Sequence, residues 1–209
     1  GRELSIGRIE AHISHLHELS RRVVSRVVAA ILPAMHEETI QQALAKLPSQ
    51  LTAYEALLKA VASIHRLTPA SHAEAESLLK KAQSLDPHYG AAHAWHARLL
   101  SIRIGQGWST DPRATASTAL GLADRAIALD PRNGLALATA GHLRSYLLHD
   151  LDGGNALLDQ AIEACPSEPL AWLLSGASQA YIGNGMEGRR RSEYALRLSP
   201  FDRYASVFH

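Results

Sequence analysis

The chain has 209 residues, enough for one or two domains with a sizeable hydrophobic core. Its 21 Lys and Arg residues against 20 Asp and Glu residues give a formal net charge of +1, which argues against a dedicated nucleic-acid-binding domain. Aromatic residues make up only 5% of the chain while alanine and leucine dominate, so an all-β sandwich or barrel is disfavoured and helices are expected.

The first 47 residues predict a long N-terminal helix and then a second helix. Apolar residues recur at three- or four-residue spacing from Ile6 to Ile31, which places one apolar stripe along a helix that Pro33 should kink or end. Helical periodicity then continues to Leu47. We expect residues 1–47 to cap the stack that follows, because the ends of helical stacks need a cover. The alternative is a signalling or dimerising helix.

Residues 48–200 carry an internal repeat in which an alanine always stands five residues before a proline. The prolines, separated by 39, 44, 35 and 34 residues, are Pro48, Pro87, Pro131, Pro166 and Pro200. The last two separations match the period of about 34 residues that stacked helix hairpins have. We therefore expect four hairpins, over residues 49–87, 88–131, 132–166 and 167–200, with residues 201–209 as the start of a truncated further one.

The extra residues of the first two repeats are expected in the hairpin turns, at residues 65–71 and 104–113, which are rich in Gly, Pro, Ser and Thr. Small residues stand at matched offsets from the prolines and predict helices that approach each other closely. They are Ala75, Ala119, Gly154 and Gly188 before a proline, and Ala97, Gly141 and Gly176 after one. The alanines that precede the later prolines, Ala82, Ala126, Ala161 and Ala195, are expected to be buried.

The last repeat resembles a tetratricopeptide repeat, on the residues from Ala171 to Gly176 and from Ala195 to Pro200. Trp172 and Gly176 match the family pattern, whereas Ser175, Gln179 and Gly188 replace its Leu, Tyr and Ala. The resemblance implies an all-α fold, a right-handed superhelix of antiparallel helix hairpins, and a protein-binding role.

A wider resemblance covers nearly the whole chain and includes the segment from Leu19 to Pro33 and the segment from Leu51 to Lys59. The arrangement is similar to the C-terminal region of bacterial adenylate/guanylate cyclases and winged-helix transcriptional regulators. In those proteins a catalytic or DNA-binding module precedes the repeats. The first residue, Gly1, is not Met, so we expect a piece of a longer protein. Neither output module is visible here, and no catalytic residue is predicted.

Three short motifs invite a chemical interpretation. Gly183, Gly185 and Gly188 match the dinucleotide fingerprint G-x-G-x-x-G, but a helix and not a strand is expected before them, so we predict a hairpin turn. The single cysteine, Cys165, excludes an internal disulfide and a cysteine-based zinc site, and we expect it to be structural. The run Arg189–Arg191 is expected on a solvated helix face.

Two pairs of histidines have the spacing that lets both side chains share a helix face, His12 with His15 and His93 with His96. Such pairs can chelate a metal, but no third ligand is predicted nearby. We therefore expect satisfied core or surface histidines, and no metal or cofactor.

A groove lined by the first helix of each hairpin is the most informative predicted site. Equal offsets from the prolines place a cationic row beside an apolar and aromatic row, formed by Lys59, Arg98, Ile102, His142, Tyr146 and Tyr181. This chemistry suits an extended peptide with acidic groups and an aliphatic or aromatic anchor. The alternative is an ordinary amphipathic surface without a ligand.

We expect a non-catalytic, protein-binding or regulatory module of a bacterial signalling or transcription-regulatory protein. The expected partner is a protein or peptide segment in the groove, with a second copy of the chain as another candidate, and without direct contact to nucleic acid or membrane. A cytoplasmic location is expected, because there is no signal peptide and the longest apolar stretch, Val23 to Met35, is too short to span a bilayer. The alternatives are a small-molecule-sensing region of a nucleotide cyclase and a dimerisation module.

Overall fold

A computed structural model describes residues 51–198, so the predictions for residues 1–47 and 201–209, including His12 and His15, lie outside the described residues. The described part contains helices and no strand. Its helices are α2 (Ala53–Ile64), α3 (Pro69–Leu85), α4 (Gly90–Gly105), α5 (Pro112–Leu129), α6 (Gly134–Leu147), α7 (Leu151–Ala164), α8 (Pro169–Tyr181) and α9 (Gly185–Leu198).

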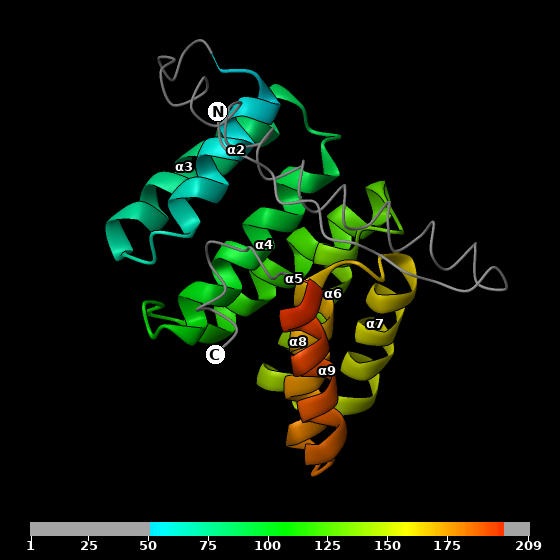
Figure 1. Ribbon diagram of the computed structural model, residues 1–209. Coiled ribbons are helices and arrows are strands. Elements are labelled where there is room, and N and C mark those ends of the chain that lie inside the picture. The colour runs from blue at the N-terminus through cyan, green and yellow to red at the C-terminus, as the bar shows by residue number, and fades with distance from the viewer. Residues whose placement is uncertain (1–50, 199–209) are drawn as a thin grey trace, which may run out of the picture. The chain divides into compact units, whose positions relative to one another are not determined.

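The helices pair in chain order into four hairpins, α2 with α3, α4 with α5, α6 with α7, and α8 with α9 (Figure 1). Short connections make the two helices of each pair antiparallel. The extensive contacts run between helices of one hairpin or of consecutive hairpins, and the first helices α4, α6 and α8 follow one another as neighbours. The predicted all-α fold of stacked hairpins is therefore confirmed.

Prolines fix where two of the second helices begin. Pro69 and Pro112 occupy the first turns of α3 and α5, where a residue without a free N–H is tolerated. The side chain of Thr68 accepts a hydrogen bond from the backbone N–H of Ser71, and Asp111 does the same for Ala114. The two predicted loops were thus too long at residues 65–71 and 104–113, because both prolines start helices and α4 continues to Gly105.

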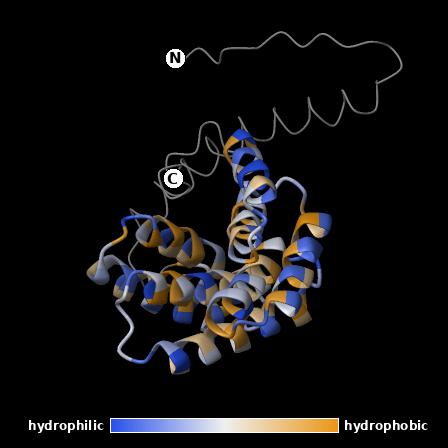
Figure 2. Ribbon diagram, turned by 90° about the horizontal axis from the view of Figure 1, so that it is seen from below, coloured by the Kyte–Doolittle hydropathy of each residue, from blue (hydrophilic) through white to orange (hydrophobic). Residues whose placement is uncertain are grey.

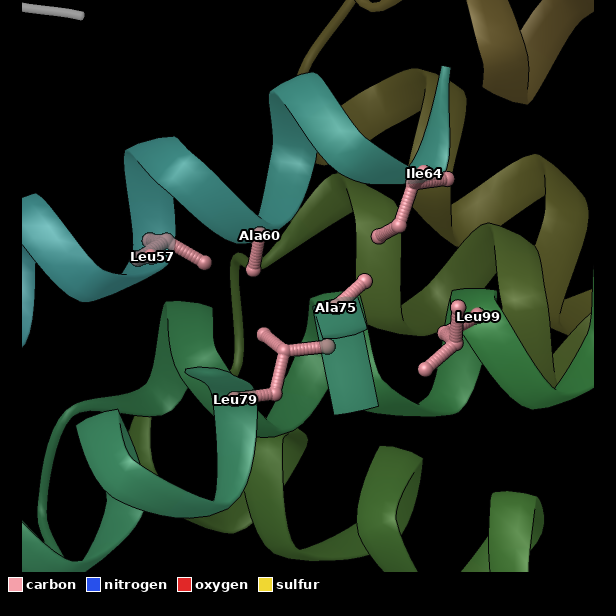
Figure 3. Close-up of a cluster of buried hydrophobic side chains, with 6 residues drawn as sticks. All are labelled: Leu57, Ala60, Ile64, Ala75, Leu79 and Leu99. Atoms are coloured by element: carbon pink, nitrogen blue, oxygen red, sulfur yellow. The ribbon is translucent and has the colours of Figure 1, made fainter. Parts of the chain in front are cut away.

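The core consists of small residues from the repeat and large residues that fit between them. Ala82, Ala126, Ala161 and Ala195 are all fully buried, as predicted. Figure 3 shows one cluster in which side chains of α2, α3 and α4 meet, formed by Leu57, Ala60, Ile64, Ala75, Leu79 and Leu99. Figure 2 shows hydrophobic and hydrophilic residues interspersed along the helices. None of the helices within residues 51–198 is long and apolar enough to cross a membrane.

Glycines allow helices to approach each other closely in the last two hairpins. A Cβ atom added at Gly141 of α6 would lie 2.8 Å from the carbonyl oxygen of Gly154 in α7. A Cβ atom at Gly176 of α8 would lie 2.8 Å from the carbonyl oxygen of Gly188 in α9. Since Cβ atoms essentially never approach other atoms closer than 3.0 Å, both positions require glycine. The predicted close approach at these matched small residues is confirmed.

Trp108, in the connection between α4 and α5, contacts the preceding hairpin. Its indole ring meets the buried ring of His72 of α3 edge to face, with ring centroids 4.9 Å apart. His72 Nε2 lies 3.2 Å from the carbonyl oxygen of Ile64, and because a carbonyl only accepts, this nitrogen carries the proton. Burial lowers the pKa of His72. The insertion in the second repeat thus covers a polar residue of the first.

Candidate functional site

Three aromatic side chains stack across neighbouring first helices. His142 and Tyr146 lie one turn apart on α6, with ring centroids 5.6 Å apart and nearly parallel planes. Tyr146 in turn stacks with Tyr181 of α8 at a centroid distance of 6.1 Å. The two tyrosines remain 45% and 52% exposed. We call His142, Tyr146 and Tyr181 the aromatic row.

Arg98 belongs to α4, which packs against α6, and its charge acts on His142 of the aromatic row. Its side chain is half-buried, and burial lowers the pKa of the guanidinium to about 10, while Glu168 acts in the opposite direction. Burial, and next the positive charge of Arg98, lower the pKa of His142 to about 4. His142 is therefore neutral at pH 7, and Arg98 is the cation at this end of the row.

The structure thus brings together four of the six residues predicted for the groove, Arg98, His142, Tyr146 and Tyr181. Ile102 differs from the prediction, since it is half-buried against the core cluster of Leu57 and Leu99 and contributes to the interior. Lys59 is half-buried on α2, the first helix of the first hairpin. The place of Lys59 in the predicted cationic row stays a prediction.

Sequence reasoning missed two features of this surface. Glu168, the N-cap residue of α8, exerts its charge on Arg98 although the two lie far apart in sequence. Two further large apolar side chains are exposed just beyond the C-termini of α6 and α8, Leu148 at 56% and Ile182 at 46%. Glu168 has no acidic counterpart acting on Arg98 from another repeat, so the periodicity carried no signal for it. Leu148 and Ile182 occupy the same position after consecutive first helices, so a comparison of the residues that follow those helices could have found them.

His93 and His96 are both engaged by Gln83 of α3. The Gln83 amide nitrogen lies 3.3 Å from His93 Nδ1, and its carbonyl oxygen lies 3.3 Å from His96 Nδ1. The Gln83 amide thus donates a hydrogen bond to His93 and accepts one from His96. Burial lowers the pKa of His96 to about 4. Among residues 51–198 no group of three or more His, Cys, Asp or Glu side chains is arranged to hold a metal ion.

The G-x-G-x-x-G match has a structural explanation in each of its glycines. Gly183 has a φ of +85° just after α8, Gly185 begins α9, and Gly188 forms the close contact with Gly176. The element before the motif is a helix, whereas the dinucleotide fingerprint follows a strand. The prediction of a hairpin turn is correct.

The arginine run is only partly a solvated face. Arg189 and Arg190 are exposed and pair with Glu193 and Glu187 of their own helix. Arg191 points inward instead, where it donates hydrogen bonds to Ser175 of α8 and, at 3.0 Å, to Asp159 of α7. The prediction was therefore wrong for Arg191, because the third arginine faces the preceding helices and connects α9 to both of them.

Cys165 occupies the C-cap of α7, where its backbone N–H donates to the carbonyl of Ala161 at 3.0 Å. The Cβ atom of Cys165 lies close to Gly134, since a Cβ atom added at Gly134 would lie 2.9 Å from it. The side chain thus fills space between two helices.

Comparison with solved structures identifies the fold. The chain is similar to a thermophilic tetratricopeptide-repeat protein of Thermus thermophilus, with 17% identity, coverage of 91% of this chain and 95% of that one, and a TM-score of 0.61. It is also similar to MamA from Desulfovibrio magneticus, with 15% identity, coverage of 87% and 94%, and a TM-score of 0.51.

No family model matches the chain, and no curated protein matches it significantly. The structural matches concern the fold, which is the superhelical arrangement of tetratricopeptide-repeat proteins. The wider resemblance to cyclases and winged-helix regulators remains a prediction.

Proposed function

We propose that this chain is a non-catalytic protein-binding module, and that an extended segment of a partner protein lies across the aromatic row. We further propose that the module belongs to a bacterial signalling or transcription-regulatory protein in the cytoplasm. The stacked-hairpin fold supports the first proposal, because such folds present one face of successive first helices as a continuous binding surface. The second rests on the wider sequence resemblance.

The observation that carries the binding proposal is the pair of stacked, half-exposed tyrosines on neighbouring helices, Tyr146 and Tyr181. Tyrosine is enriched among the residues that dominate binding energy at protein interfaces. Mutual stacking already orders the two rings, so a partner gains contact area with little further loss of side-chain entropy. An apolar or aromatic side chain of the partner fits this surface best.

The test uses the full chain and a phage-displayed library of random linear peptides. We expect selection to yield peptides that share an apolar or aromatic position. The double variant Tyr146→Ala/Tyr181→Ala should weaken binding of a selected peptide about tenfold or more, because it removes both exposed rings. Fluorescence anisotropy with a labelled peptide measures the dissociation constant, and circular dichroism checks that the variant remains helical.

The matched control is Leu85→Ala/Met186→Ala, which removes exposed apolar side chains from the second helices α3 and α9. It should change the dissociation constant less than about twofold, the range of a substitution outside an interface. Equal weakening by both double variants, or a library selection that yields no binder, contradicts the proposal.

A further inference from the structure

Arg98 is a half-buried cation without an ion-pair partner in residues 51–198. Glu168 is the acidic group that acts on it, and it does so through its charge. Glu168 also accepts a hydrogen bond from the backbone N–H of Leu170, which holds its carboxylate at the start of α8. A guanidinium partly removed from water and left unpaired is unfavourable, and an incoming anion relieves this cost.

The neighbours of Arg98 decide which anion fits. His142 is neutral at pH 7 because burial and the charge of Arg98 lower its pKa to about 4, so it contributes no second positive charge. Glu168 adds negative charge close by. A phosphate group carries close to two negative charges and is usually bound by several cations or backbone N–H groups. A carboxylate carries one charge and matches the planar fork of a single guanidinium.

The positions of Arg98 and the tyrosines set the spacing within a bound peptide. Arg98 lies on α4, whereas Tyr146 and Tyr181 lie on α6 and α8, the next first helices in the stack. Neighbouring helix axes are about 8–10 Å apart, so the distance from Arg98 to the tyrosine pair is roughly 10–15 Å. An extended chain advances about 3.3 Å per residue, so this distance corresponds to about three to five residues.

We infer that the bound segment carries an Asp or Glu side chain that pairs with Arg98, about three to five residues from an apolar or aromatic side chain that lies on Tyr146 and Tyr181. This inference rests on the proposed function and adds to it the charge and spacing of the partner. The segment crosses three first helices, with its acidic residue at α4 and its apolar residue between α6 and α8.

A double-mutant cycle tests the contact. The protein variants are the full chain and Arg98→Gln, and the probes are a selected peptide and the same peptide with its acidic residue changed to Gln. We expect Arg98→Gln to weaken binding of the acidic peptide about tenfold and to change binding of the Gln peptide by less than about twofold. The Arg98→Gln chain should fold, because it loses a half-buried charge that has no ion pair to break within residues 51–198.

The matched control is Arg113→Gln, which removes a positive charge from an exposed position of α5. It should leave the binding of both peptides unchanged. Equal effects of Arg98→Gln on both peptides overturn the inference. Tighter binding of a peptide with phosphoserine at the acidic position, lost in Arg98→Gln, also overturns it in favour of a phosphate. If the tyrosine double variant still loses binding in either case, the proposed function stands while this inference fails.

Discussion

Gly154→Ala is expected to lower the free energy of unfolding by about 2–3 kcal/mol, the effect of overpacking a close helix contact. An alanine Cβ at this position would lie 2.8 Å from the carbonyl oxygen of Gly141 and 2.9 Å from the backbone nitrogen of Ser145. Both atoms belong to the backbone of α6, so they cannot rotate away, and α6 and α7 must separate.

The disturbance should extend to the next hairpin. The added Cβ would also meet the hydroxyl of Ser145, which accepts a hydrogen bond from the hydroxyl of Ser178 on α8 at 3.2 Å. This pair is buried, so moving Ser145 leaves a polar group without its partner. Gly154 therefore affects contacts of α6 with both α7 and α8.

The matched control is Gly121→Ala in α5, where no atom lies within 4 Å of the added Cβ. At this exposed helical position alanine should stabilise by about 0.5–1 kcal/mol, because it reduces the conformational freedom of the unfolded chain. Urea unfolding followed by circular dichroism measures both variants. A Gly154→Ala protein as stable as the wild type would contradict the observed helix contact.

Acid is expected to destabilise the chain through its buried histidines. The pKa of His96 is lowered from 6.5 to about 4, mainly by burial and further by Lys80, Arg103 and His93, while Glu76 opposes the shift. The unfolded chain therefore takes up a proton near pH 6.5 that the folded chain takes up only near pH 4. The contribution of a neutral His96 is fully present above pH 6.5 and is lost as the pH falls toward 4.

Over this range His96 alone accounts for up to about 3 kcal/mol, and His72 and His142, whose pKa values are also lowered, act in the same direction. His96→Asn should reduce the slope of stability against pH, because the Asn amide can still donate a hydrogen bond to Gln83 but does not titrate. Urea unfolding at pH 7.5, 6 and 5 measures the slope. His88→Asn, at an exposed position, is the control. An unchanged slope in His96→Asn would contradict the role of burial at this site.

Much of the fold could be predicted because it follows from offsets that recur. The glycine contacts between α6 and α7 and between α8 and α9 were predicted from equal distances to the prolines, and the structure confirms both. The same regularity places His142 beside Arg98 and Tyr146 beside Tyr181, since equal offsets in consecutive hairpins lie on neighbouring helices.

Features that occur once in the chain could not be predicted this way. Gln83 links His93 with His96, and Glu168 acts on Arg98, yet neither has an equivalent in the other repeats. Ile102 was placed in the groove because its offset equals that of Tyr146 and Tyr181. Ile102 of the second hairpin, however, packs against the cluster around Leu57 of the first. At this place in the stack the same offset therefore points into the interior. Equal offsets predict which helix face a residue occupies, but the local side chains decide how open that face is.

The three tryptophans lie in separate parts of the stack, so intrinsic fluorescence can show in which part unfolding begins. Trp95 and Trp108 lie in the second hairpin or its connection, beside His65 and His72 of the first, whereas Trp172 lies in the last hairpin against Tyr194. Extensive contacts join only helices of the same or consecutive hairpins, so the two ends of the stack influence each other through intermediate helices. Single-tryptophan versions of this chain would therefore distinguish fraying that begins near Trp172 from fraying that begins near Trp95 and Trp108.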